Sequence, residues 1–373
     1  VITKMVGAHH GARDLSKLYA TYRGPGPNHG TLRGYVKGLI SHIFVIICWQ
    51  VGLLMNVFNV MQPTPTGPQI AVALPTTAGV WYAIYLAMGS DIKLAGVVIG
   101  GLLVFCALPH VGLRLPYMRW VQQLLVDCGD YYEHGAHTCY EFELSESLPR
   151  GIWAYHPHGM FSWFMAAIHL RHPLRFDPKW VPKTLPRQGL AVRLLCDSPL
   201  FRHFVVDTVR STWPADKKGM LKLLERDESI GLIPGGFHEA CVTCRGIHRA
   251  YVLKKKGFVK LALRYGYALY PCYVFGEADT YYNPQGFTQF RTWLADFNVP
   301  AILPFGRFFF PPLPKRDLGL YFVAGKPLVL PKITDPTDED LDKYHAQYVQ
   351  ALKELFDRNK ANFGYADAEL EIM

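Results

Sequence analysis

A long stretch without charge constrains this chain more than any other feature of its sequence. Between Lys37 and Asp91 there is no Asp, Glu, Lys or Arg. Such a segment is hard to place on a surface in contact with water, whereas contact with a bilayer explains it directly. Only 18% of all residues are charged, compared with roughly 25% in soluble domains. The sequence therefore predicts a membrane protein.

Residues 38–113 contain three apolar runs. The first, Gly38 to Met61, is long enough to cross the ~30 Å hydrocarbon core as a helix of ~20 residues. The second, Ile70 to Gly89, and the shorter third, Leu94 to Pro109, are separated only by "SDIK", which is typical of a hairpin that enters or crosses the membrane. The alternative for each run is a buried helix of a globular core. We expect a membrane region of two to three apolar segments.

The N-terminal tail, residues 1–37, carries six Lys or Arg and one Asp. By the positive-inside rule this tail is cytosolic. Two spans would keep the rest of the chain in the cytosol, whereas three would place it in the lumen. The chain has no Asn-x-Ser/Thr site, and its eight cysteines follow no disulfide spacing, which favours the reducing, cytosolic side.

Residues 114–373 have the pattern of an α/β domain. The segment "LRLPYMRWVQQLLVDC" predicts an amphipathic helix, which either lies at the membrane interface or packs on its own domain. Beyond it, apolar strands predicted at 151–155, 229–236, 268–276 and 319–325 alternate with helical patterns at 254–266 and 338–362. Thr337, with Asp340, caps the last helix, and Gly364 ends it. This alternation predicts an α/β sandwich.

Two histidines flank a proline in "AYHPHGMFSW", where a predicted strand gives way to a helix. His156 and His158 would lie near the backbone N–H groups of Gly159 and Met160 at the helix N-terminus. The partial positive charge there lowers the pKa of a nearby imidazole and stabilises an oxyanion. A neutral base and an oxyanion site are what direct acyl transfer from a thioester to an alcohol requires. The alternative is a turn whose histidines only satisfy local hydrogen bonds.

Several longer segments carry a resemblance to a known family. Following "YHPHG", the chain contains "IPGGFHEA", "KKGFVKLALRYG", "YPCYVFGE", "GKPLVLPK" and "YHAQYVQALKELFDRNKANFG" in this order. Together they resemble the type-2 diacylglycerol acyltransferase family, part of the glycerolipid acyltransferase superfamily, from about Arg114 to Met373. The resemblance implies an N-terminal transmembrane hairpin followed by an acyltransferase domain of the α/β class. This chain differs by the additional apolar run Gly38 to Met61.

The resemblance also implies an activity and a location. Members esterify a lipid alcohol with acyl-CoA in the endoplasmic reticulum membrane and are often found on lipid droplets. We expect diacylglycerol as acceptor, with monoacylglycerol and long-chain wax alcohols as alternatives. Acyl-CoA is a substrate, and we expect no cofactor, metal ion or nucleic-acid partner. The sequence leaves the number of spans and a homo-oligomeric state open.

We assign provisional roles to the residues of these segments. Superfamily members carry an Asp five residues after the histidine, but here those positions are Phe161 and Trp163. Glu239 is the best substitute, because a turn at Gly235 and Gly236 would bring it beside the histidines. We predict His158 as the base, His156 as a positioning group or second base, and Glu239 as the group that orients them. The sequence does not decide between the two histidines.

Acyl-CoA carries several phosphate charges, so basic residues should lie near the thioester. On the helix predicted at 254–266, three cations are spaced by four and share one face. With two arginines just upstream, the predicted acyl-CoA-binding residues are Arg245, Arg249, Lys256, Lys260 and Arg264. A solvated helix face is the alternative. The net charge of +9 also suits anionic headgroups.

Three other interpretations compete with this one. The run His238, Cys241, Cys244 and His248 has residue types that bind zinc, although the spacing is unusually compact. Ser162, four residues after His158, would be the nucleophile of a hydrolase, but the chain has no G-x-S-x-G elbow. A catalytically silent lipid-binding protein on the same fold is the third.

Overall fold

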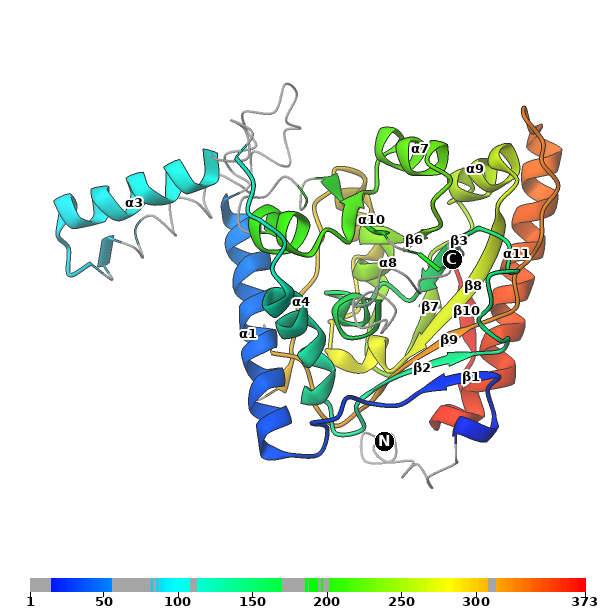
Figure 1. The fold of residues 1–373 in the computed structure, drawn as a ribbon, viewed down its shortest axis with the longest axis horizontal. Coiled ribbons are helices and arrows are strands. Elements are labelled where there is room, and N and C mark those ends of the chain that lie inside the picture. Colours follow the sequence, from blue (N-terminus) through cyan, green and yellow to red (C-terminus); the bar gives the residue numbers. More distant parts are fainter. Residues whose placement is uncertain are drawn as a thin grey trace.

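The structure is a computed structural model that describes residues 15–55, 82, 85–86, 88–107, 113–169, 185–186, 188–193, 196, 201–307 and 313–373. An eight-stranded mixed sheet runs through the described part, with helices on both faces (Figure 1). The prediction of an α/β fold is confirmed. The strands are β1 (Thr21–Arg23), β2 (Ala136–Tyr140), β3 (Gly151–His156), β4 (Gln188–Ala191), β5 (Thr212–Pro214), β6 (Ile230–Leu232), β8 (Ala268–Phe275) and β9 (Leu320–Ala324).

The strand that carries the histidines lies inside the sheet. The order is β1-β2-β9-β8-β3-β6-β4-β5, and β3 pairs in parallel with both β8 and β6. The carboxyl ends of these three strands therefore meet at one edge, which is where ligands bind in open α/β sheets. A separate parallel pair joins β7 (His248–Ala250) to β10 (Leu370–Ile372).

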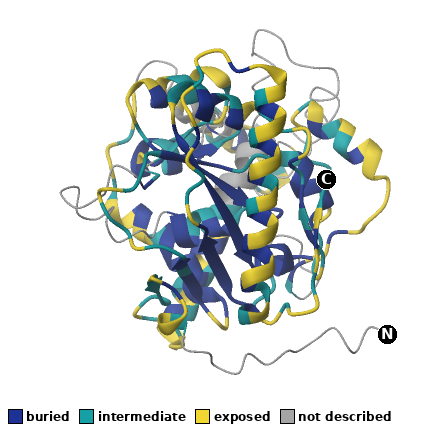
Figure 2. Cartoon of the chain, turned by 90° about the vertical axis from the view of Figure 1, so that its right-hand side faces the viewer, coloured by how far each residue is buried: buried dark blue, intermediate teal, exposed yellow. Residues whose placement is uncertain are grey.

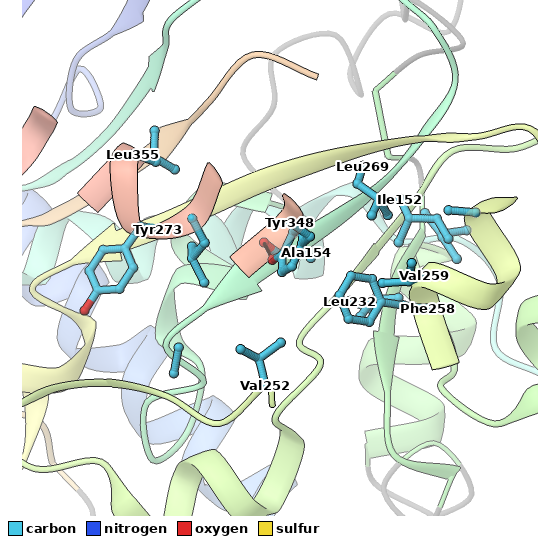
Figure 3. Close-up of a cluster of buried hydrophobic side chains, with 14 of the residues drawn as sticks. Ile152, Ala154, Leu232, Val252, Phe258, Val259, Leu269, Tyr273, Tyr348 and Leu355 are labelled. Carbon is cyan, nitrogen blue, oxygen red and sulfur yellow. Dashed lines mark hydrogen bonds between the residues drawn. The ribbon is translucent and has the colours of Figure 1, made fainter. Parts of the chain in front are cut away.

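Alternation along β3 divides the interior into two layers. Ile152 and Ala154 belong to a cluster that α9 (Gly257–Tyr265) and α11 (Asp338–Asn359) cover. Trp153 and Tyr155 point to the opposite layer. Figure 3 shows Ile152 and Ala154 among Val259, Phe258 and Tyr348. Since residues two apart share a face, His156 belongs to the α11 side.

Helix α11 begins and ends as its sequence predicts. Thr337 and Asp340 form a reciprocal capping box at its start. The helical stretch continues as a 3-10 turn, η10 (Lys360–Phe363), and ends at Gly364 with φ +85°. In Figure 2 the inner side of α11 is buried against the sheet and its outer side is exposed. α11 is thus a fixed cover for the strand that ends in His156.

The N-terminal segment is part of this fold. β1, within the predicted tail 1–37, pairs with β2 at the edge of the sheet. α1 (Leu32–Met55) begins inside that tail, covers much of the first apolar run, and packs on α4 (Arg119–Val126) and on the 3-10 turn η4 (Asp127–Tyr131). The helix predicted after Arg114 is α4, which packs on its own domain and buries Val121 and Leu125.

The other two apolar runs are described unequally. α3 (Ile92–Ala107) covers most of the third run and projects from the rest of the chain in Figure 1. The second run, Ile70 to Gly89, lies largely outside the described residues. The predicted hairpin between the second and third runs therefore also lies largely outside them. Among the described residues, no helix combines the length and the apolar character needed to cross a bilayer.

The remaining described helices complete the covering layers. They are η2 (Leu15–Lys17), η5 (Met165–His169), η7 (Arg202–Asp207), α7 (Lys217–Glu225), α8 (Gly236–Val242), η8 (Glu277–Thr280) and α10 (Thr288–Asp296). Two of them, α8 and η8, follow β6 and β8 directly. They therefore start at the sheet edge where β3 ends, and each contributes a buried carboxyl group there.

Candidate active site

His156 is held from both sides and has no access to solvent. Its Nδ1 donates to the carboxylate of Glu239, at 3.1 and 3.2 Å from the two oxygens. Its Nε2 lies 3.1 Å from the hydroxyl of Tyr348 on α11. Burial raises the pKa of Tyr348 well above its usual value, so this group remains a hydroxyl and donates to Nε2. Both ring nitrogens are therefore occupied.

Glu239 joins the two histidines. Besides His156, its Oε1 accepts the backbone N–H of His158 at 3.0 Å, and the side chain is fully buried. A Cβ at position 235 would overlap Oε2, which explains the glycine at the turn before α8. Gly236 follows with φ +50°, a conformation that favours glycine. The structure thus brings Glu239, Gly235 and Gly236 to the two histidines.

His158 differs from His156 because it lines a cavity of about 800 Å³. Its Nδ1 lies 3.0 Å from the carbonyl oxygen of Gly159. Since a carbonyl only accepts, Nδ1 carries the hydrogen and Nε2 keeps its lone pair. Burial lowers the pKa of His158, and the contact with Gly159 and the charge of Glu239 oppose that shift. The ring is therefore a neutral acceptor on the cavity wall.

Ser162 lies against the ring of His158. Its hydroxyl donates to the carbonyl of His158 at 2.8 Å, and its Oγ is 3.2 and 3.4 Å from the two ring nitrogens. Its φ of +53° is unusual for a residue other than glycine. The hydroxyl proton is thus directed to a carbonyl and away from the base. This arrangement does not activate Ser162 as a nucleophile.

The helix after the histidines begins later than predicted. Its first residue is Trp163, and the helical residues 163–169 include the π-helix η5. The N–H groups of Trp163 and Phe164 each donate to an oxygen of Glu277 at 3.0 Å. The positive end of the helix therefore faces Glu277, and the expectation that it lies at Gly159 and Met160 is wrong. The low pKa of His158 results chiefly from burial.

Glu277 is a site residue that sequence reasoning missed. It is fully buried, and burial raises its pKa to about 8. It also contacts the histidine turn, because a Cβ at Gly159, whose φ is +66°, would overlap its Oε1. The available signal was its place directly after β8, the parallel neighbour of β3, in the segment "YPCYVFGE".

The lining of the cavity includes two chemically different groups of residues besides His158. One is apolar and includes Val45, Leu125, Phe161, Phe201 and Val205. The other contains Arg193, Lys254, Lys255 and Lys256. Arg193 pairs with Asp216 and Lys256 with Asp342, so part of this positive charge is compensated. The sequence-based prediction did not include Lys254 or Lys255.

Of the five predicted acyl-CoA-binding residues, Lys256 lines the cavity. The other four do not line it. Arg245 forms a bidentate pair with Asp317 at 2.8 and 3.0 Å, and Arg249 pairs with Glu371 at 2.7 Å. Arg264 lies 3.5 Å from Asp335, and Lys260 lies on α9 outside the cavity lining. Lys260 and Arg264 have the predicted helical spacing on α9, but Arg245, Arg249 and Arg264 pair with carboxylates of the same domain.

The suggested zinc ligands have separate partners. His238 contacts Asp296 at 2.7 Å, the thiol of Cys241 donates to a backbone carbonyl, and His248 contacts the hydroxyl of Tyr273 at 2.8 Å. Cys244 forms an isolated β-bridge with Ile247. Within the part of the chain that the structure describes, no group of three or more His, Cys, Asp or Glu side chains is placed to hold a metal ion.

Comparison with known proteins agrees with this arrangement of segments. The sequence model of the family described as "Diacylglycerol acyltransferase" matches residues 102–373. The chain belongs to the diacylglycerol acyltransferase family. The matched segment contains both histidines, Glu239, Glu277 and Tyr348, whereas β1 and α1 precede it. No solved structure matches the chain.

Curated relatives carry acyltransferase names. The chain is 33% identical to diacylglycerol O-acyltransferase 1 of Eremothecium gossypii, over 60% of this chain and 50% of that protein. It is 36% identical to diacylglycerol O-acyltransferase 2 of Dictyostelium discoideum, over 56% and 66%. It is 32% identical to acyl-CoA wax alcohol acyltransferase 2 of Mus musculus, over 57% and 67%. The matches span about half to two thirds of these proteins.

We predict that Tyr348→Phe destabilises the domain. Without the hydroxyl, Nε2 of buried His156 has no donor, and an unsatisfied buried group costs about 1–3 kcal/mol. Denaturant unfolding of the purified protein measures the loss. Tyr344→Phe, one turn earlier on α11 and half-buried, is the matched control. Equal effects of the two changes would show that the bond to His156 contributes nothing.

A second prediction concerns Glu277. Because its pKa is raised to about 8 from the usual 4.5, folding takes up a proton between these values, and its contribution to stability falls as pH rises through that window. Glu277→Gln cannot titrate. The melting temperature of this variant relative to the native chain should therefore increase from about pH 5 to pH 8. Glu339→Gln, exposed on α11, should show no such trend.

Proposed function

We propose that this protein transfers the acyl group of acyl-CoA to the hydroxyl of a lipid alcohol, with diacylglycerol as the favoured acceptor and triacylglycerol as product. The observation that carries the proposal is His158, a neutral base whose Nε2 keeps its lone pair on a cavity with an apolar and a lysine-containing region. Membership of the family and the names of the relatives support it.

The proposed reaction needs one proton acceptor. Nε2 of His158 takes the proton of the acceptor hydroxyl while its oxygen attacks the thioester carbonyl carbon. The tetrahedral intermediate then collapses, the C–S bond breaks, and the imidazolium returns the proton to the sulfur, which leaves as CoA thiol. Glu239 holds the turn at the backbone of His158, and His156 fixes Glu239. No enzyme-linked acyl group and no cofactor are required.

Donors for the oxyanion must come from the turns around His158. The helix N-terminus is not available, because Glu277 binds its N–H groups. Gly236 is also committed, since its N–H donates to Ile233 at 3.2 Å. We therefore propose the N–H groups of Gly159 and Met160, in the turn itself, for this role. Lys254, Lys255 and Lys256 line the cavity, and we propose that they attract the phosphates of CoA.

The chemistry of the cavity restricts the acceptor to a class of lipid alcohols, whereas the shape of the cavity does not choose among them. Diacylglycerol, monoacylglycerol and long-chain alcohols each have a hydroxyl attached to an apolar tail. The name of one relative identifies it as a wax alcohol acyltransferase. The rival from another class, a silent lipid-binding protein, would fill the same cavity without turnover. The experiment below separates these alternatives.

We also propose that the protein works in the endoplasmic reticulum membrane and on lipid droplets, anchored by its N-terminal apolar runs. Support comes from the charge-free stretch and from the outer face of α1, where Val36, Ile40 and Ile43 are 43–51% exposed. These side chains recur at helical spacing, which forms an apolar stripe suited to lipid. The acceptor would then reach the cavity from the membrane side.

We predict that His158→Ala abolishes turnover while the protein still folds and inserts into membranes. Membranes containing the protein would receive labelled acyl-CoA and, separately, diacylglycerol, monoacylglycerol or a fatty alcohol, and the labelled products would be separated by class. His134→Ala, on an exposed loop, is the control. Triacylglycerol that persists in His158→Ala would refute the mechanism. Label found only as free fatty acid would indicate a hydrolase, and no product would indicate the silent protein.

The pH dependence of turnover should reflect the protonation state of His158. Because burial lowers the pKa of His158 below 6.5, its ring stays neutral at pH 7, and activity should fall only when pH drops below 6.5. Initial rates with saturating substrates between about pH 5 and pH 8 measure this limb. An acidic limb centred above pH 7 would assign the proton to another group.

A further inference from the structure

Helix α1 lies outside the residues that match the family, yet it supplies part of the cavity wall. The family match begins at residue 102, whereas α1 spans Leu32–Met55. Val45, near the middle of α1, lines the same cavity as His158. The cavity of this chain is therefore completed by a segment that precedes the family domain.

The position of α1 relative to the site is fixed by close contacts. Gly38 allows the helix backbone to approach Tyr131, because a Cβ there would overlap it. The buried ring of His42 lies 4.3 Å from that of Trp163, the first helical residue after the histidine turn, and its Nε2 is 3.3 Å from the hydroxyl of Tyr132. Any shift of α1 would disturb these contacts. These contacts thus fix the position of α1, and with it Val45, relative to the histidine turn.

The surroundings of Val45 are made of hydrocarbon. It packs against a cluster whose buried members include Leu125, Phe201 and Val205 from α4 and the η7 region. Phe161 packs against the same cluster and also lines the cavity, three residues after His158. Members of this apolar cluster therefore line the cavity that the base and α1 share. Such a lining suits an alkyl chain and offers a charged group no partner.

We propose that α1 closes the apolar region where the hydrocarbon tail of a substrate ends, and that Val45 determines how long a tail is accepted. The inference rests on the proposed acyl transfer. Each methylene buried in an apolar site improves binding roughly fourfold. A bulkier residue at position 45 would exclude the last methylenes of a long tail from the cavity. Binding of short tails would not change, because these do not reach α1.

The same helix provides a matched control. Ile43 lies two residues before Val45 on the outer face and is 47% exposed. Ile43→Trp and Val45→Trp add the same bulky side chain to the same helix, one facing away from the domain and one facing the cavity. Both changes affect the hydropathy of α1 alike. A difference between them therefore reports the cavity and not the anchoring of the helix.

The experiment compares both variants with the native chain in membranes. In one panel, octanoyl-, lauroyl-, palmitoyl- and stearoyl-CoA are supplied with one diacylglycerol. In the other, palmitoyl-CoA is fixed and the tails of the diacylglycerol vary in the same way. We expect Val45→Trp to lower kcat/KM for the longest tail relative to the shortest by roughly tenfold or more in one panel, with Ile43→Trp unchanged. The panel that shifts identifies whose tail reaches α1.

The outcomes separate this inference from the proposed function. Unchanged preferences of Val45→Trp in both panels, with native turnover, would overturn the role of α1. A native chain that is inactive with every acceptor would instead refute the acyl transfer. If Val45→Trp fails to fold, Val45→Ala is the second variant. It enlarges the cavity and should raise kcat/KM for the longest tail relative to the shorter ones. An unaltered preference for tail length would equally overturn the proposal.

Discussion

The buried carboxylate of Glu239 is the contact on which the site depends. A carboxylate without access to water needs hydrogen-bond donors, and here they come from the ring of His156 and the backbone of His158. His156 ends the strand β3, Glu239 belongs to α8, and Tyr348 reaches the same ring from α11. Loss of this carboxylate would therefore loosen a strand, two helices and the turn together.

Two histidines separated by one residue acquire different tasks because a strand alternates. His156 shares a face with Ile152 and Ala154 and enters the layer under α11, where both of its nitrogens find partners. The chain then turns, and His158 emerges on the cavity with one nitrogen bound to a carbonyl. A second buried carboxyl, Glu277, holds the other side of the turn. His156 is therefore suited to support the turn, and His158 is suited to proton transfer.

The sequence predicted those features that depend on neighbouring residues. Strands β3, β6, β8 and β9 lie in apolar runs next to turn residues, helices α9 and α11 have helical periodicity, and Glu239 follows a recognisable turn. Strands β1, β4, β5, β7 and β10 have three or four residues each and do not lie in an apolar run of this kind. Tyr348, 192 residues after His156, resembled an ordinary core residue of its helix. The acidic partners of Arg245, Arg249 and Arg264 lie far along the chain, so these cations resembled ligand-binding ones.

Pairing of the N-terminal segment with elements about a hundred residues later affects the order in which the protein forms. β1 and α1 are synthesised before the strand and helices that they contact, because β2, α4 and η4 follow about a hundred residues later. Domains usually fold as they emerge, starting from the N-terminus. Here β1 and α1 have no folded surface to join until the charge-free stretch has been made. Synthesis of that stretch therefore precedes completion of the sheet, and the two are successive steps of one assembly process.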